Sequence, residues 1–291
     1  MRLFLLALAS VSLATAATAD GAYAAHVQDW RNVYETSLKA DDGWLTLAGL
    51  FWLKPGVNTA GSADGSDVLL PPGSAPAHIG VFRFHGNITV FRAEAGVPVL
   101  VNGRSVAEAP LKADSDGVPD LVQIGDFTML VIHRGQRYGI RVKDKRSPAR
   151  VNFTGLRWYP VKEEYRVVAE FHSYPKPKLI PIPNILGDTL QTPCPGYATF
   201  TLRGAKLRLE AVAEDGRLFF VFKDRTAGKT TYGSGRFLNA DMPVEGKVTL
   251  DFNQAYSPPC AFTPYATCPL PPAANHLAVA IEAGEMKYGD R

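Results

Sequence analysis

The sequence predicts a mainly β protein, in which a β-sandwich is followed by an antiparallel β-barrel-like domain. Short runs rich in Val, Ile, Leu, Phe and Tyr recur along the chain between turn residues, which is the pattern of antiparallel strands. Glycine and proline make up 26 and 22 of the 291 residues, and both interrupt helices. A helical hydrophobic period occurs only near the N-terminus. We therefore expect many short strands, tight turns and little helix.

Residues 1–19 have the features of a secretory signal peptide. Arg2 provides the positive start, residues 3–13 the apolar stretch, and residues 17–19 a small-residue cleavage site, with a second such site at residues 22–24. The apolar stretch is too short to span a bilayer, and no later segment is long enough, so no transmembrane segment is predicted. We expect an exported protein, periplasmic or extracellular. The alternative interpretation is an uncleaved N-terminal anchor.

The net charge is too small to indicate nucleic acid binding, and no nucleic acid partner is expected. The formal charge of +3 falls to +2 when residues 1–19, which carry only Arg2, are removed. One dense basic cluster lies on strand-like sequence, where it forms either a solvated strand face or a site for an acidic ligand. Its members are Arg134, Arg137, Arg141, Lys143, Lys145, Arg146 and Arg150.

The three cysteines leave two interpretations open. Cys260 and Cys268 are eight residues apart in a proline-rich segment, and a disulfide between them would stabilise it by about 2–3 kcal/mol. Cys194 would then remain a thiol. A zinc site could use Cys260, Cys268 and His276, but no pair has the short spacing that preformed zinc sites favour. We predict no metal and no cofactor.

An N-terminal helix is expected over residues 20–43. Val27, Trp30, Tyr34 and Leu38 recur at helical spacing and form an apolar stripe that would lie against a sheet. Asp41-Asp42-Gly43 ends the pattern.

Residues 44–150 are predicted to form the β-sandwich. Turns such as Pro55-Gly56 and Asn102-Gly103 separate strand-like runs, and almost no helical pattern is present. The expected strands are residues 45–53, 68–70, 78–85, 88–92, 99–101, 121–124, 127–133 and 138–142.

The order of features in this part resembles the forkhead-associated domain, a β-sandwich that recognises phosphothreonine. The matching features are Gly56, Gly61-Ser62, Asp67-Val68-Leu69-Leu70, Ser74, His78, Asn102-Gly103 and Gly125-Asp126. Ser62 stands where such domains place an arginine, and the spacing from Ser74 to His78 is one residue too long. The resemblance therefore implies the scaffold without phosphopeptide binding.

Residues 151–291 are predicted to form the barrel-like domain. Its expected strands are residues 165–172, 178–182, 198–202, 206–213, 218–223, 235–238, 247–252 and 277–282. The segment 256–275 contains six prolines and two cysteines, so it is neither a helix nor a central strand. A long ordered loop commonly positions functional side chains, and this segment is the expected wall of a site.

Polar residues gather beside turns in this second part. Arg236 could hold an anion or form a buried pair with Asp224 or Asp251. Asp251 and Asn253 share one face at a strand end, where they could orient a ligand or cap the next turn. The candidate ligand-binding residues are Asp224, Thr226, Tyr232, Arg236, Asp251, Asn253, Tyr256, Cys260, Cys268 and Asn275.

The chain is identified as a member of a family, number 1684 in the domain-of-unknown-function series, with a resemblance that spans nearly the whole mature chain, from Asp42-Gly43-Trp44-Leu45 to Glu285. The residues that carry the resemblance are Asp224 with Thr226, Thr231-Tyr232, Gly235-Arg236-Phe237-Leu238, Asp251-Phe252-Asn253, Ala255-Tyr256, residues 258–272, Asn275 and Ala283-Gly284-Glu285. The resemblance implies no established activity. It does imply a reactive or ligand-contacting thiol, since relatives without an export signal carry a similar Cys-containing loop.

We expect a binding or accessory protein of the cell envelope that holds a small polar or anionic ligand, a metabolite or a glycan, in its C-terminal β domain. One alternative is a hydrolase that uses Asp251, Asn253 and the 256–275 loop as its active site. A glycosidase would draw its carboxylate pair from Asp224, Asp251, Glu282 and Glu285. The other alternative is a structural envelope protein.

Overall fold

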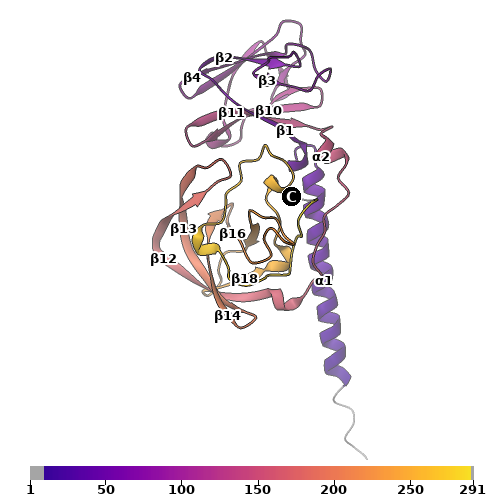
Figure 1. Ribbon diagram of the computed structural model, residues 1–291, viewed down its shortest axis with the longest axis vertical. Helices are drawn as coiled ribbons and strands as arrows, with labels where there is room; N and C mark the ends of the chain where they lie inside the picture. The colour runs from indigo at the N-terminus through magenta and orange to yellow at the C-terminus, as the bar shows by residue number, and fades with distance from the viewer. Residues whose placement is uncertain (1–9, 290–291) are drawn as a thin grey trace, which may run out of the picture. The chain divides into compact units, whose positions relative to one another are not determined.

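A computed structural model describes residues 10–289 of the chain, with side chains from residue 21 (Figure 1). The protein is mainly β, as predicted. It divides into two compact units. We call one the sandwich unit, which contains Leu38–Phe153 and Phe262–Ala266, and the other the terminal unit, which contains the chain up to Ser37, Thr154–Ala261 and the segment from Thr267 onward.

Helix α1 (Ser10–Lys39) is longer than the helix expected over residues 20–43 (Figure 1). Its sequence is rich in alanine, the best helix former, and Lys39 lies in the last turn, where a cation interacts favourably with the helix dipole. Residues 1–9 of the predicted signal peptide lie outside the described residues, and export stays a prediction. Among residues 10–289, no helix is both long and apolar enough to cross a membrane.

The sandwich unit contains two sheets around one apolar core. The first has the order β3 (Val68–Leu69), β2 (Gly56–Gly61), β4 (Gly80–His85), β5 (Ile88–Ala93) and β8 (Glu108–Leu111). The second has the order β1 (Leu47–Trp52), β11 (Arg137–Asp144), β10 (Phe127–Arg134), β9 (Val122–Ile124), β6 (Leu100–Val101) and β7 (Arg104–Ser105). Phe82 and Phe91 of the first sheet share the core with Val131 and Ile140 of the second. The likeness to a forkhead-associated domain stays a prediction.

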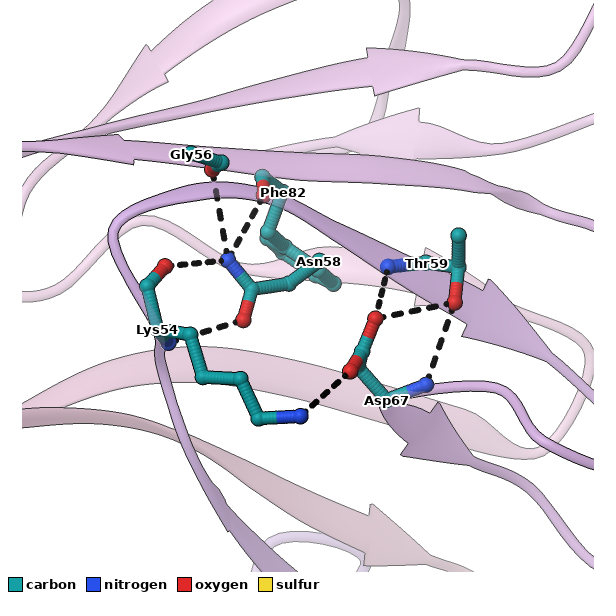
Figure 2. A network of polar contacts seen from close by, with 6 residues as sticks. All are labelled: Lys54, Gly56, Asn58, Thr59, Asp67 and Phe82. Atoms are coloured by element: carbon teal, nitrogen blue, oxygen red, sulfur yellow. Dashed lines mark hydrogen bonds and ion pairs between the residues drawn. The ribbon is translucent and has the colours of Figure 1, made fainter.

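A polar network fixes β2 and β3, which form a parallel pair (Figure 2). Asp67 Oδ2 accepts hydrogen bonds from the Thr59 N–H (2.9 Å) and hydroxyl (3.1 Å), and Lys54 Nζ lies 3.1 Å from Asp67 Oδ1. Asn58, which is buried, donates to the carbonyl oxygens of Lys54 (2.8 Å) and Phe82 (3.3 Å). The buried polar groups at this corner are therefore satisfied within the unit.

The terminal unit contains two antiparallel sheets. The larger has the order β14 (Ala205–Glu210), β13 (Thr189–Leu202), β12 (Arg166–Pro183) and β18 (Lys247–Asp251). The smaller has the order β15 (Val212–Glu214), β16 (Arg217–Phe222) and β17 (Arg236–Ala240). Both sheets contribute to one core, in which Phe200 of β13 and Phe222 of β16 contact Phe252.

The expected barrel does not close among the described residues, and that part of the fold prediction was wrong. The free edge of β17 pairs with Tyr256 rather than with a strand of the larger sheet, through Phe237 N–H to Tyr256 O (2.8 Å) and Tyr256 N–H to Phe237 O (3.0 Å). Pro258 and Pro259 follow directly and cannot donate to a ladder, so the pairing ends there.

The segment 256–275 forms no strand, as its prolines predict, and contains two short 3-10 turns, Pro259–Ala261 and Ala273–Asn275. Its middle part, Phe262–Ala266, belongs to the sandwich unit, where the Thr263 hydroxyl donates to the Leu47 carbonyl oxygen (3.1 Å).

Candidate functional site

Arg236 forms a buried ion pair with Asp224. Arg236 begins β17, Asp224 follows β16, and Arg236 Nη2 lies 2.6 Å from Asp224 Oδ2 with both side chains 1% exposed. The guanidinium also donates to the carbonyl oxygens of Ala283 and Ile281. The Arg236 guanidinium, which the sequence allowed either to bind an anion or to form a buried pair, is therefore engaged by groups of the chain itself.

The Asp224 carboxylate accepts further hydrogen bonds from the chain. Its Oδ1 accepts from the Thr226 backbone N–H (2.6 Å) and from the Thr226 hydroxyl, which lies 2.8 Å from the Thr231 hydroxyl. Gly235 precedes Arg236 with φ +105°, and a Cβ there would lie 2.6 Å from the Phe222 carbonyl oxygen. Only glycine lets the chain enter β17 at this point.

Asn275 ties the two sheets of the terminal unit together. Its side chain is 1% exposed, and its Nδ2 donates to the carbonyl oxygens of Glu210 (3.0 Å) and Val221 (2.9 Å). Its Oδ1 accepts from the Glu210 N–H at 2.7 Å. Asn275 therefore clamps β14 against β16.

Asp251 and Asn253 hold helix α1. The Tyr23 hydroxyl lies 2.8 and 2.9 Å from the two Asp251 carboxylate oxygens and accepts a hydrogen bond from Asn253 Nδ2 (2.9 Å). Burial, and secondly the Asp251 carboxylate, raise the pKa of Tyr23 well above its usual range. Asn253 also binds the backbone of Lys162, and Arg31 Nη2 donates to the Asn253 carbonyl oxygen (3.1 Å). The strand-end pair thus holds a helix of its own unit.

All three cysteines are thiols, so the structure does not contain the Cys260–Cys268 disulfide, one of the two interpretations left open by the sequence. The Cys260 N–H instead donates to Cys268 Sγ at 3.2 Å, and the Tyr232 hydroxyl donates to the Cys260 carbonyl oxygen at 3.1 Å. Cys194 lies 3.1 Å from Glu210 Oε2, and burial raises the pKa of this thiol to about 11. Cys194 is therefore protonated at neutral pH, where it is a poor nucleophile.

Glu285 is the most unusual ionisable group of the terminal unit. The side chain is fully buried, and its Oε2 accepts from the Ser257 backbone N–H (2.8 Å). Within the described residues, neither Glu285 Oε1 nor the buried Ser257 hydroxyl has a hydrogen-bond partner. Burial raises the pKa of Glu285 to about 7, although the hydrogen bond from the Ser257 backbone N–H acts in the opposite direction.

The backbone that carries Glu285 packs closely against the turn after β18. Gly284 has φ +78°, and a Cβ there would lie 2.4 Å from the Ala255 carbonyl oxygen, which accepts the Glu285 N–H at 2.8 Å. The two motif segments Ala255-Tyr256 and Ala283-Gly284-Glu285 are therefore in contact, and this close approach explains why residue 284 is a glycine.

Half-buried aromatic residues surround this carboxyl group. The Tyr34 hydroxyl donates to the Ser257 carbonyl oxygen (3.2 Å), and its ring contacts those of Tyr256 (5.0 Å) and Trp158 (6.1 Å). Trp30 stacks on Tyr34 at 5.6 Å. Burial, and next the charge of Glu285, raise the pKa of Tyr34 well above its usual range. We call Glu285, Ser257, Tyr34, Tyr256, Trp158 and Trp30 the Glu285 site.

A second carboxylate lies beside these rings. Glu35 Oε1 accepts a hydrogen bond from Trp158 Nε1 at 2.9 Å. Burial raises the pKa of Tyr256 to about 12, and its hydroxyl accepts a hydrogen bond from Asn239 Nδ2 (3.0 Å). The arrangement combines acceptor groups with aromatic faces, which suits a ligand that carries hydrogen-bond donors or a positive charge. Within residues 10–289, no three metal-ligating side chains converge.

Of the ten predicted residues, only Tyr256 belongs to the Glu285 site. Asp224, Thr226 and Arg236 lie together but are buried, and Asp251 with Asn253 forms a separate group. From the sequence, Glu285 was expected only as one of four possible carboxylates and as part of the family motif, and Ser257 was not expected at all. The signal was the motif Ala283-Gly284-Glu285, but a motif does not show burial.

Comparisons with known proteins place the chain in a family. Residues 151–286 match the family described as "Protein of unknown function (DUF1684)". An uncharacterised protein of Haloarcula marismortui with a solution NMR structure is 33% identical, over 47% of this chain and 78% of that protein, with a TM-score of 0.40. No curated protein matches. Through residues 151–286, the chain belongs to the family of proteins of unknown function DUF1684.

Proposed function

We propose that this protein binds a small polar ligand at the Glu285 site of its terminal unit. One observation carries the proposal: Glu285 and Ser257 are buried and joined by a backbone hydrogen bond, yet neither Glu285 Oε1 nor the Ser257 hydroxyl has a hydrogen-bond partner within the described residues. Buried polar groups are nearly always paired, because an unpaired one costs about 1–3 kcal/mol. A ligand hydroxyl or amine would satisfy both groups.

The charges favour a neutral or cationic ligand over the anionic one that the sequence allowed. Arg236 is paired with Asp224, while Glu285 and Glu35 would repel an anion. One face of Tyr34 is covered by Trp30, and the Arg31 guanidinium lies 4.8 Å from the centre of the Trp158 ring. The half-buried parts of Tyr34, Tyr256 and Trp158 that remain could pack against a sugar ring or attract an ammonium group. We therefore favour a sugar or an amine-bearing metabolite.

Thermal-shift screening of the protein against sugars, amines and organic acids tests this proposal. A sugar or an amine should raise the melting temperature of the wild type, and Glu285→Gln should reduce that shift. Glu282→Gln, an exposed carboxylate three residues away, is the matched control and should keep it. A shift that persists unchanged in Glu285→Gln would place the ligand elsewhere.

We also propose that the protein is exported. Support comes from the charged start, the apolar stretch and the small-residue site within residues 1–19. Expression in a bacterial host with fractionation and mass spectrometry should find a shortened chain outside the cytoplasm. An intact chain that stays in the cytoplasm would contradict export.

A further inference from the structure

An open hollow of about 640 Å³ lies in the sandwich unit, away from every residue discussed above as a ligand site. Its volume is within the range of sites for small molecules, roughly 300–1,000 Å³. The lining comes from β2, β4, β5, β7 and the loop 94–97. Three of the lining side chains are charged: Arg83, Arg92 and Glu94.

The strand register places Arg83 and Arg92 on the same sheet face. Val57 is directly opposite Arg83, and Val81 is directly opposite Arg92, while Phe82 and Phe91 point into the core. Arg83 and Arg92 are therefore diagonal neighbours on adjacent strands, with Cβ atoms about 7–8 Å apart. Their flexible guanidinium groups can converge on one carboxylate between them.

The rest of the hollow is apolar. Val57 is 58% exposed, although it is a large hydrophobic residue. Val81, Val97 and Val106 are half-buried and also line the hollow. An apolar group placed there would cover this surface and remove it from water.

The two arginines are only weakly engaged by the chain. Arg83 Nη1 lies 3.8 Å from Glu108 Oε2, and both side chains are about half exposed, at 48% and 51%. This contact is long and screened by water. Within the described residues, the Arg92 guanidinium makes no ion pair. Glu94 is the one acidic side chain of the lining, and Glu108, at its edge, is directly opposite Arg92 in the strand register. Glu108 therefore lies beside both arginines without a close ion pair to either.

We propose that this hollow binds small organic acids, with the carboxylate between Arg83 and Arg92 and an apolar body against the valines. Glu108 competes with the ligand for Arg83. This site is independent of the Glu285 site, since it lies in the other unit and favours the opposite charge.

Isothermal titration of the full chain with three probes tests both features of the ligand. Octanoate carries the carboxylate and the apolar body, octanamide only the body, and acetate only the carboxylate. We expect octanoate to bind at least about tenfold more tightly than either of the others. Backbone amide shifts in NMR spectra should locate it at Gly80, Gly96 and Ser105.

Three variants have three different expected effects on octanoate binding. Arg92→Gln should weaken octanoate binding about tenfold. Glu108→Gln should tighten it by about two- to fivefold, because Arg83 loses its competing partner. Arg104→Gln, an exposed arginine of β7 outside the lining, should leave it unchanged. The proposal is overturned if octanoate does not bind, if octanamide binds equally well, or if Arg92→Gln and Arg104→Gln behave alike.

Discussion

Glu285 couples the stability of the terminal unit to pH. Its pKa is about 7 in the folded protein and 4.5 for an unperturbed carboxyl group, so the native state holds this proton more tightly. The resulting stabilisation is fully present below pH 4.5 and is lost as pH rises through 7.

We predict that Glu285→Gln removes this dependence. Relative to wild type, the free energy of unfolding of the variant should rise by roughly 3 kcal/mol between pH 4.5 and 8. Urea unfolding of both proteins at the two pH values measures the difference. A difference that does not change with pH would show that Glu285 is not a buried acid.

Arg236 and Asp224 depend on each other. Arg236→Ala leaves a buried carboxylate without its partner and should lower the free energy of unfolding by about 3–5 kcal/mol. The double variant Arg236→Met with Asp224→Ala should recover part of that loss. Arg225→Gln, an exposed neighbour, should cost less than about 0.5 kcal/mol in the same urea titration. Equal losses in Arg236→Ala and Arg225→Gln would contradict a buried pair.

Little of the candidate site was predictable from the sequence, because burial cannot be read from it. Asp224, Thr226 and Arg236, which belong to one motif, do lie together, but the ten candidate residues do not form one site. An arginine, however, looks the same in sequence whether it faces a ligand or a buried aspartate. Ser257 gave no signal, because its importance comes from the backbone contact with Glu285, 28 residues away.

At the scale of elements, the Tyr23 hydroxyl is one of the polar contacts that hold α1, together with those of Arg31, Tyr34 and Glu35. Tyr23→Phe removes the hydrogen bonds to Asp251 and should lower the free energy of unfolding by about 1–3 kcal/mol. Tyr159→Phe removes an exposed hydroxyl contact with Thr230 and should cost far less. Urea unfolding monitored by circular dichroism compares them. Equal losses would mean that the Asp251 contact does not anchor the helix.

Helix α1 and strand β12 each contain a feature that the hydrophobic pattern of the sequence did not predict. The apolar stripe found the buried Val27 and Leu38 but not Arg31, which is 3% exposed, because periodicity counts only apolar residues. Strand β12 (Arg166–Pro183) contains four prolines and joins the two strands that were expected over residues 165–172 and 178–182. Its pairing with β13 skips from Ser173 to Lys178, and this irregularity accommodates Pro175 and Pro177, which cannot donate to the ladder.

At the scale of the whole molecule, the two units have separate cores. Phe91 is buried in the sandwich unit and Phe220 in the terminal unit. Calorimetry should therefore resolve two unfolding transitions. Phe91→Ala should lower the midpoint temperature of one transition, and Phe220→Ala that of the other, each by roughly 10 °C or more. One transition lowered equally by both variants would mean that the units unfold together.

The path of the chain between its units sets an order of events during synthesis. The main segment of the sandwich unit ends at Phe153, and Phe262–Ala266 joins it later in the chain, where Thr263 reaches Leu47. Helix α1 is synthesised first, and two of its partners, Asp251 and Asn253, follow more than 200 residues later. The core of the terminal unit includes Leu250, Leu277 and Ile281, so this unit cannot close until almost the entire polypeptide has emerged. An open terminal unit is compatible with the export proposed above, because a protein must be unfolded to pass through a secretion pore.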